Sequence, residues 1–200
     1  MTLLLTSCVD LKFAVPNDYK TMLKANGLKF LNREIIHDEY LDKQSLTLLE
    51  DGSFVRRRNG EAQLKFAVDW QGNYCSYEGA AEFHILKGQD AKDALREKYN
   101  VDLSELIATC SRKFSRETWI SDKCMIVIDE MGANEIDKGN KFGEIKLQKG
   151  KEETVEEVIQ RAVGYLKQMG LTRVTNGKIL AGFEKDHQKA YCKLVSMSMK

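Results

Sequence analysis

Three cations in one short segment have the types and spacing to bind an anion. Arg56, Arg58 and Lys65 flank an Asn59-Gly60 pair. An Asn-Gly pair between two runs of alternating residues predicts a β-hairpin. Because side chains alternate faces along a strand, Arg56 and Arg58 share one face, and Lys65 can join them from the return strand. Such a patch favours the binding of an anion with several charges, such as a polyphosphate. The alternative is that these cations form a strand face that is simply exposed to solvent.

The composition is typical of a globular protein with a sizeable core. The chain has 200 residues, of which 42% are hydrophobic and 30% are charged. This length predicts a single domain over residues 1–200. The formal net charge is +1, which argues against a nucleic-acid partner, because any basic site must be local.

The cysteines and the apolar runs bear on the cellular compartment. Five cysteines without a CxxC pair argue against a disulfide framework and against a structural zinc site, and they favour a reducing cytoplasm. The segment before Cys8 is too short for a leader and reads as a strand. No run approaches the roughly 18 apolar residues of a membrane span, so we expect no membrane partner.

The elements predicted along the chain belong to the α+β class. The expected strands cover about 7–14, 33–41, 45–50, 53–58, 62–68, 80–87, 109–118, 123–130 and 142–148. The expected helices cover 16–27, 90–99, 102–108, 152–169 and 178–195. Most strands are charged on one face and apolar on the other, which suits either a sandwich or a closed barrel. Periodicity alone leaves both open.

Short charged motifs recur in a fixed order along these strands. They are Cys8-Val9-Asp10-Leu11-Lys12, Asp38-Glu39-Tyr40-Leu41-Asp42, Arg56-Arg57-Arg58, Leu64-Lys65, Glu82-Phe83-His84, Ser115-Arg116-Glu117, Ile126-Val127-Ile128-Asp129, Gly143-Glu144-Ile145-Lys146 and Gly177-Lys178-Ile179-Leu180. The ordered set resembles the CYTH superfamily, the triphosphate tunnel metalloenzymes, and within it the animal thiamine triphosphatases.

The resemblance implies an eight-stranded antiparallel β-tunnel, a closed barrel with a polar lumen that is flanked by helices. Members of that family bind a triphosphate in the tunnel and hydrolyse it with Mg or Mn. The implied substrate-binding residues are Lys12, Arg56, Arg58, Lys65, Arg116 and Lys178, of which Lys12 and Lys65 are also the expected catalytic residues. The implied metal ligands are Asp10, Glu82, Asp129 and Glu144.

The acidic part of this pattern is incomplete. Cys8 stands where the family has its first glutamate, Asp10 shortens the second, and Lys146 replaces the last. A thiol is a poor ligand for Mg. Lys146 shares a strand face with Glu144, so it either neutralises that ligand or serves as a counter-charge for phosphate. These changes weaken the expected Mg or Mn site, whereas the basic set is retained.

Three functions follow from this pattern. The first is a thiamine-triphosphatase-like hydrolase of an organic or inorganic triphosphate. The second is a degenerate tunnel protein that binds a polyphosphate or a phosphorylated metabolite without turnover. The third is a tunnel used for a different small organic ligand, since a fold does not dictate a function. In each case we expect a monomer with a small-molecule partner, because a closed tunnel leaves no free sheet edge.

Overall fold

A computed structural model describes residues 7–67, 81–132, 139–174 and 192. Its strands are β1 (Ser7–Ala14), β2 (Lys29–Asp42), β3 (Ser53–Arg58), β4 (Glu61–Ala67), β5 (Ala81–Lys87), β6 (Ile107–Ile120), β7 (Met125–Met131) and β8 (Lys141–Leu147). Its α-helices are α1 (Tyr19–Ala25), α2 (Thr47–Glu50), α3 (Gly88–Tyr99) and α4 (Val155–Gln168). The expected α+β class and the eight antiparallel strands are confirmed.

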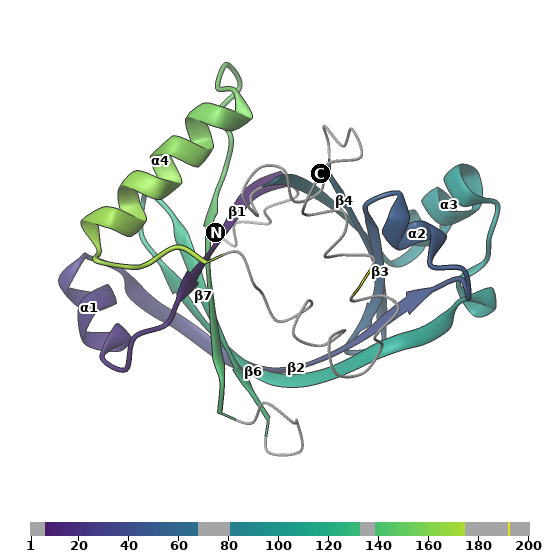
Figure 1. Ribbon diagram of the computed structural model, residues 1–200, viewed down its shortest axis with the longest axis horizontal. Coiled ribbons are helices and arrows are strands. Elements are labelled where there is room, and N and C mark those ends of the chain that lie inside the picture. Colours follow the sequence, from purple (N-terminus) through teal and green to yellow (C-terminus); the bar gives the residue numbers. More distant parts are fainter. Residues whose placement is uncertain (1–6, 68–80, 133–138, 175–191, 193–200) are drawn as a thin grey trace.

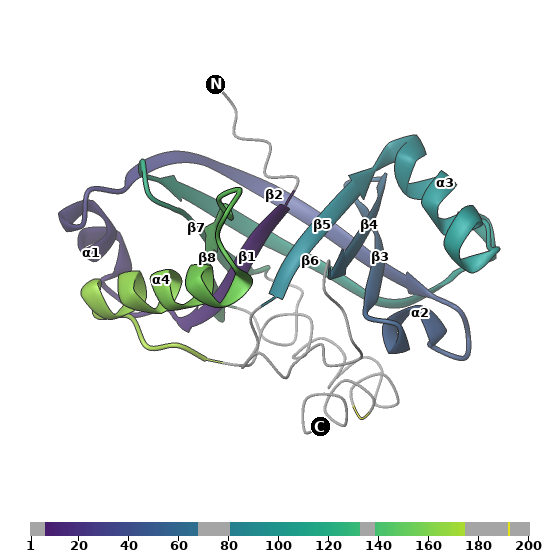
Figure 2. The ribbon, with the colours of Figure 1, turned by 90° about the horizontal axis from the view of Figure 1, so that it is seen from above.

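Each strand pairs with two others in the order β1-β5-β4-β3-β2-β6-β7-β8. The strand β1 pairs with β5 on one side and with β8 on the other, from Val9 opposite Leu147 to Ala14 opposite Phe142. The strand order therefore returns to its start as a closed barrel. Figure 1 shows the ring of strands, and Figure 2 shows the long strands β2 and β6 running the length of the molecule.

The predicted hairpin is confirmed between β3 and β4. The register places Arg56 opposite Gln63 and Arg58 opposite Glu61. Asn59 and Gly60 have φ values of 49° and 85°. Two successive positive φ values are the requirement of the tight turn that Asn-Gly favours. The turn thereby fixes which side chains of the two strands share a face.

Helices cover the outer face of the barrel in two groups (Figure 1). In the first group, α1 and α4 pack with the outward-facing residues of β1 and β6–β8 around Leu11, Ile145 and Trp119. Helix α4 begins at the N-cap Thr154, whose side chain accepts a hydrogen bond from the Glu157 N–H. In the second group, α2 and α3 pack with β2–β4. Because the apolar residues face outward onto helices, the alternate residues face into the barrel.

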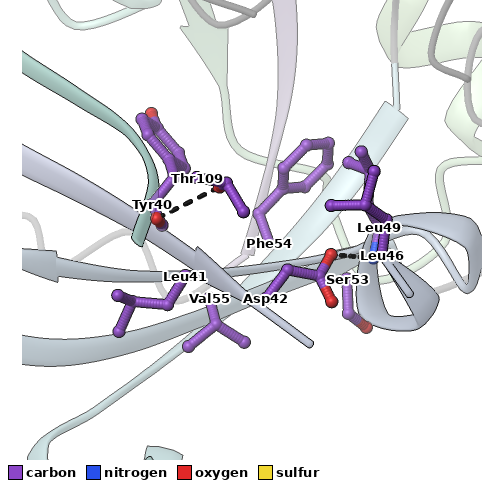
Figure 3. Close-up of a pocket in the computed structure, with 9 residues that line it drawn as sticks. All are labelled: Tyr40, Leu41, Asp42, Leu46, Leu49, Ser53, Phe54, Val55 and Thr109. Atoms are coloured by element: carbon purple, nitrogen blue, oxygen red, sulfur yellow. Dashed lines mark hydrogen bonds between the residues drawn. The ribbon is translucent and has the colours of Figure 1, made fainter. Parts of the chain in front are cut away.

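One predicted strand is wrong. Residues 45–50 were expected to be extended, but Thr47–Glu50 form α2. The Asp42 carboxylate accepts hydrogen bonds from the Leu48 and Leu49 N–H groups at 3.1 and 2.9 Å, and the second is visible in Figure 3. These bonds satisfy backbone donors at a helix start, where they have no partner within the helix. The local apolar run concealed this cap because its acceptor precedes the run.

The helix expected over 102–108 is also wrong. Only Leu103–Glu105 are helical, as a single 3-10 turn, and β6 begins at Ile107. β2 and β6 are longer than expected, because they pair with each other along almost their whole length. The helix expected over 178–195 falls almost wholly outside the described residues. Within the described ranges, no helix has the length and apolar character to cross a membrane.

Candidate functional site

The charged residues of the sequence motifs gather on the inner face of the barrel. On β1, Val9 and Leu11 belong to the outer core, so Asp10 and Lys12 face inward. Apart from Asp42, which caps α2, the buried and half-buried charges on this face are the cations Lys12, Arg56, Arg58, Lys65, Arg112, Arg116 and Lys146 and the carboxylates Asp10, Asp38, Asp129 and Glu144. With Asp42 included, these buried and half-buried charges of the described chain comprise seven cations and five carboxylates, so the cations exceed the carboxylates by two.

Two inner-face arginines each bind a carboxylate through one edge of the guanidinium group. Arg58 donates through Nε and Nη2 to the two Asp38 oxygens, both at 2.6 Å. Arg116 donates in the same way to Asp129, at 2.6 and 2.7 Å. A guanidinium is a planar fork with five N–H donors. In both residues Nη1 makes no hydrogen bond to the described residues, so one edge of each fork can still bind an oxyanion.

A third arginine adds to the positive charge at this place. Arg56 donates to the Gln63 side-chain oxygen through Nε and Nη2, at 2.9 and 2.7 Å, and lies 3.5 Å from Asp38. Burial, together with the nearby Arg56 and Arg116, lowers the pKa of Arg58 below its usual value, although Asp38 opposes this. The three guanidinium groups are therefore close enough to repel one another, and an added anion would relieve that repulsion.

Lysine side chains pair with the inner-face carboxylates Asp10 of β1 and Glu144 of β8. The Asp10 Oδ2 atom lies 2.9 Å from the Lys65 Nζ, and its Oδ1 lies 2.9 Å from the Lys146 Nζ. The Lys146 Nζ also lies 2.8 Å from Glu144. Burial alone would raise the pKa of Asp10, but Lys146 and Lys65 lower it. Burial alone would lower the pKa of Lys146, but Asp10 and Glu144 raise it above its usual value.

Cys8 is a buried thiol beside this group of lysines. Its Sγ donates to the Asp10 Oδ1 at 3.0 Å, and 2% of the residue is exposed. Burial and the neighbouring Asp10 raise the pKa of Cys8 to about 12. A protonated thiol is not a metal ligand, because it is the thiolate that binds metals. This agrees with the expectation that the Cys8 thiol is a poor ligand for Mg.

The residues present do not fit the Mg or Mn that the resemblance implies. Both oxygens of Asp10 and of Asp129 already accept hydrogen bonds or ion pairs from cationic side chains, and Glu144 is paired with Lys146. Across the described ranges, no group of three or more His, Cys, Asp or Glu residues could hold a metal ion. Of the expected metal ligands, Asp10, Asp129 and Glu144 are thus engaged by the protein's own cations.

Two expected site residues have no described side-chain position. Glu82 lies opposite Val9 in the register of β1 with β5, whereas Asp10 lies opposite Ala81. The Glu82 side chain is outside what the structure describes, and so is Lys178. Their roles as a metal ligand and as a phosphate ligand stay predictions.

Arg112 is an inner-face residue that the motifs did not indicate. It lies opposite Asp38 in the register of β2 with β6, and 1% of it is exposed. Its spacing of two from Phe114 and of four from Arg116 was the available signal, because residues at even spacing share a strand face. On the same face Phe114 packs with Ile36 and Met131 in an apolar cluster, and its ring lies 5.6 Å from the Arg116 Cζ.

A pocket at the end of β2 is too small to be a ligand site. It is lined by residues that include Tyr40, Asp42 and Thr109 (Figure 3). Its volume of about 10 Å³ is roughly the space that one water molecule needs. The Asp42 carboxylate in this pocket already caps α2. The inner-face charges therefore remain the candidate site.

Comparison with known proteins supports the fold. No protein-family model matches the sequence, and no curated protein matches it. Among solved structures, the PH1012 protein of Pyrococcus horikoshii is 17% identical with a TM-score of 0.58, over 84% of this chain and 95% of that one. An adenylate cyclase candidate from Vibrio parahaemolyticus is 15% identical with a TM-score of 0.59, over 84% and 93% of the two chains.

A third solved structure has a stated activity. HpAC1 from Hippeastrum, an adenylyl cyclase candidate described as having a dominant triphosphatase activity, is 16% identical with a TM-score of 0.52, over 85% of this chain and 91% of that one. At this level of identity the likeness concerns the fold. All three structures share with this chain the fold that the CYTH resemblance implies. The resemblance that the sequence motifs indicated is thereby confirmed, and the chain has a CYTH-like fold.

Proposed function

We propose that the inner face of the barrel is a tunnel that binds a small molecule carrying a triphosphate or another polyphosphate. The observation that carries this proposal is the pair of arginines, Arg58 and Arg116, each held by a carboxylate on one edge. A guanidinium that is already oriented loses little conformational entropy when its other edge binds phosphate oxygens.

The charge balance supports the same ligand class. Among the buried and half-buried charges of the described inner face, the cations exceed the carboxylates by two, and burial together with Arg56 and Arg116 lowers the pKa of Arg58. A triphosphate concentrates several negative charges in a short chain, so it can contact several of these cations at once. A monoanion would leave half of the excess uncompensated. The predicted ligand Lys178 would add a further cation.

The binding proposal is tested by calorimetric titration with inorganic tripolyphosphate. Replacement of Arg58 or Arg116 with lysine keeps the charge but removes the fork. A charge-assisted hydrogen bond contributes about 1.5–3 kcal/mol, so we expect the Kd to rise roughly 10- to 100-fold.

Arg57→Lys is the matched control, because Arg57 lies on the outer face of the same strand and pairs with Glu39 at 2.8 Å. Its Kd should stay within about twofold of wild type. A tripolyphosphate Kd that is equally insensitive to all three replacements would reject the site.

Hydrolysis of the bound triphosphate is the second candidate function. The observation that favours it is the triphosphatase activity stated for HpAC1, which shares the fold. Phosphoryl transfer depends mainly on positioning and on neutralising the charge of the phosphates. Lys12 and Lys65 are the proposed catalytic residues, because ammonium groups on the inner face can stabilise charge that develops on the leaving phosphate.

The hydrolysis candidate is tested by phosphate release from thiamine triphosphate, inorganic tripolyphosphate and nucleoside triphosphates. Release that falls in a Lys12→Met variant whose tripolyphosphate Kd changes less than its kcat would support turnover. Absence of release from every substrate, with Mg²⁺, with Mn²⁺ and with chelator, would leave binding alone. In the cell we propose a cytoplasmic monomer with no nucleic-acid partner, as the cysteine content and the balanced charge favour.

A further inference from the structure

Lys146 occupies the space between two carboxylates that the CYTH resemblance assigns to a metal. Its Nζ lies 2.9 Å from the Asp10 Oδ1 and 2.8 Å from the Glu144 Oε2. The pairing of β1 with β8 produces this arrangement, because it sets Asp10 opposite Lys146 and Lys12 opposite Glu144. The lysine side chain is 14% exposed and that of Asp10 is 5% exposed. The three groups therefore form an ion-pair cluster within the barrel.

This cluster leaves little for a divalent ion to bind. Mg²⁺ requires oxygen ligands at about 2.0–2.1 Å in near-octahedral geometry. The Asp10 Oδ1 already accepts from the Cys8 thiol and from Lys146, and its Oδ2 faces Lys65 at 2.9 Å. A metal would have to displace two ammonium groups, or to lie beside them at the cost of strong repulsion in a site with little water.

The same ammonium group can serve a bound phosphate directly. An ammonium has three N–H donors, and Lys146 directs two of them to Asp10 and Glu144. The third has no partner among the described residues. A phosphate oxygen next to Lys146 would therefore meet a fixed positive charge, which is what a divalent ion would otherwise supply.

We propose that Lys146 is a built-in counter-cation that stands in place of a divalent metal, so that polyphosphate binding in this barrel needs no metal ion. This inference rests on the proposed polyphosphate site. Its consequence is opposite to that of a metal-dependent site: added Mg²⁺ should not tighten binding, and it should weaken the apparent affinity because it complexes the polyphosphate in solution.

The first test is calorimetry of wild-type protein with inorganic tripolyphosphate, in chelator and in excess Mg²⁺. We expect the Kd in chelator to be equal to or lower than the Kd in Mg²⁺. Binding that is tenfold or more tighter with Mg²⁺ would overturn the inference while leaving the polyphosphate site intact. Absence of binding in both conditions would reject the polyphosphate site itself, and the second test then decides whether Lys146 excludes a metal.

The second test measures the binding of Mn²⁺ alone, from the loss of the free-ion signal in electron paramagnetic resonance. We expect no binding to wild type and at least tenfold tighter binding to Lys146→Glu than to Lys113→Glu. The control makes the same charge change at an exposed position on the outer face of β6.

Equal Mn²⁺ binding by wild type and by Lys146→Glu would overturn the inference, and so would equal binding by the two glutamate variants. Circular dichroism checks that each variant is folded. If Lys146→Glu does not fold, Lys146→Arg and wild type decide, because both keep the cation and should leave the Mn²⁺ signal unchanged.

Discussion

Replacing Asp10 with asparagine isolates the energy of the buried ion pairs. Asp10 is 4% exposed, and its two oxygens lie 2.9 Å from Lys65 and 2.9 Å from Lys146. Asparagine keeps the shape and one acceptor oxygen but removes the charge. Breaking a buried pair by removing one partner costs about 3–5 kcal/mol. Because the amide oxygen remains as an acceptor and Glu144 still pairs with Lys146, we expect the lower end of this range, about 3 kcal/mol.

The assay is thermal unfolding followed by circular dichroism, with and without tripolyphosphate. For a chain of this size, 1 kcal/mol corresponds to roughly 2–4 °C in Tm, so the variant should melt about 6–12 °C lower. Asp93→Asn is the control, because its contact with Arg96 is 3.6 Å long and both side chains are more than half exposed. That variant should differ from wild type by about 1 kcal/mol or less.

The ligand provides the more specific readout. Asp10→Asn adds one uncompensated positive charge to the inner face, so tripolyphosphate should raise the Tm of the variant by more than it raises that of wild type. An Asp10→Asn protein as stable as Asp93→Asn would refute the ion-pair energetics. A smaller ligand-induced shift than in wild type would refute the electrostatic account of the site.

Three further predictions concern the barrel wall. The Glu117 carboxylate accepts a hydrogen bond from Lys20 at 2.8 Å. Burial alone would raise the pKa of Glu117, but its hydrogen bonds lower it. The ionised Glu117 therefore stabilises the folded protein above its unfolded pKa of about 4.3, and this stabilisation is lost as pH falls. Glu117→Gln should therefore cost about 2 kcal/mol at pH 7 in urea unfolding and much less near pH 3, and an unchanged difference would contradict this. In Gly143→Ala the new Cβ would overlap the Phe13 ring, so urea unfolding should show a loss of about 2 kcal/mol, and wild-type stability would mean that the ring moves aside. Cys8, with a pKa of about 12, should resist iodoacetamide at pH 8 in folded protein, as peptide mapping would show; rapid alkylation would contradict its burial.

The composition of the inner face was largely predictable from local alternation. The spacing of two placed Arg56 and Arg58 on one face, and the motif pattern added Arg116. The partners of these residues were not predictable, because they depend on register between distant strands. Asp38 meets Arg58 only because β2 pairs with β3 in the observed offset.

The same limit applies to Lys146. Its shared face with Glu144 follows from spacing within one strand, and pairing with Glu144 was one of the two roles that the sequence left open for it. Its contact with Asp10 requires the register of β1 with β8, which no local pattern encodes. α2 was missed for a related reason, since the acceptor that caps it, Asp42, lies outside the apolar run. Side-chain acceptors that cap a helix from a preceding strand compete with local propensity and change the outcome.

The closure of the barrel has a consequence for biosynthesis. β1 completes its pairing only with β5 and β8, so a strand made early must wait for one made late. About 130 residues separate β1 from β8, and at roughly 5–20 residues per second the ribosome needs about 7–26 s to make them. During that interval β1 has an unpaired edge beside buried charges that lack their partners. Until β8 is made, that edge is a template on which another strand can pair.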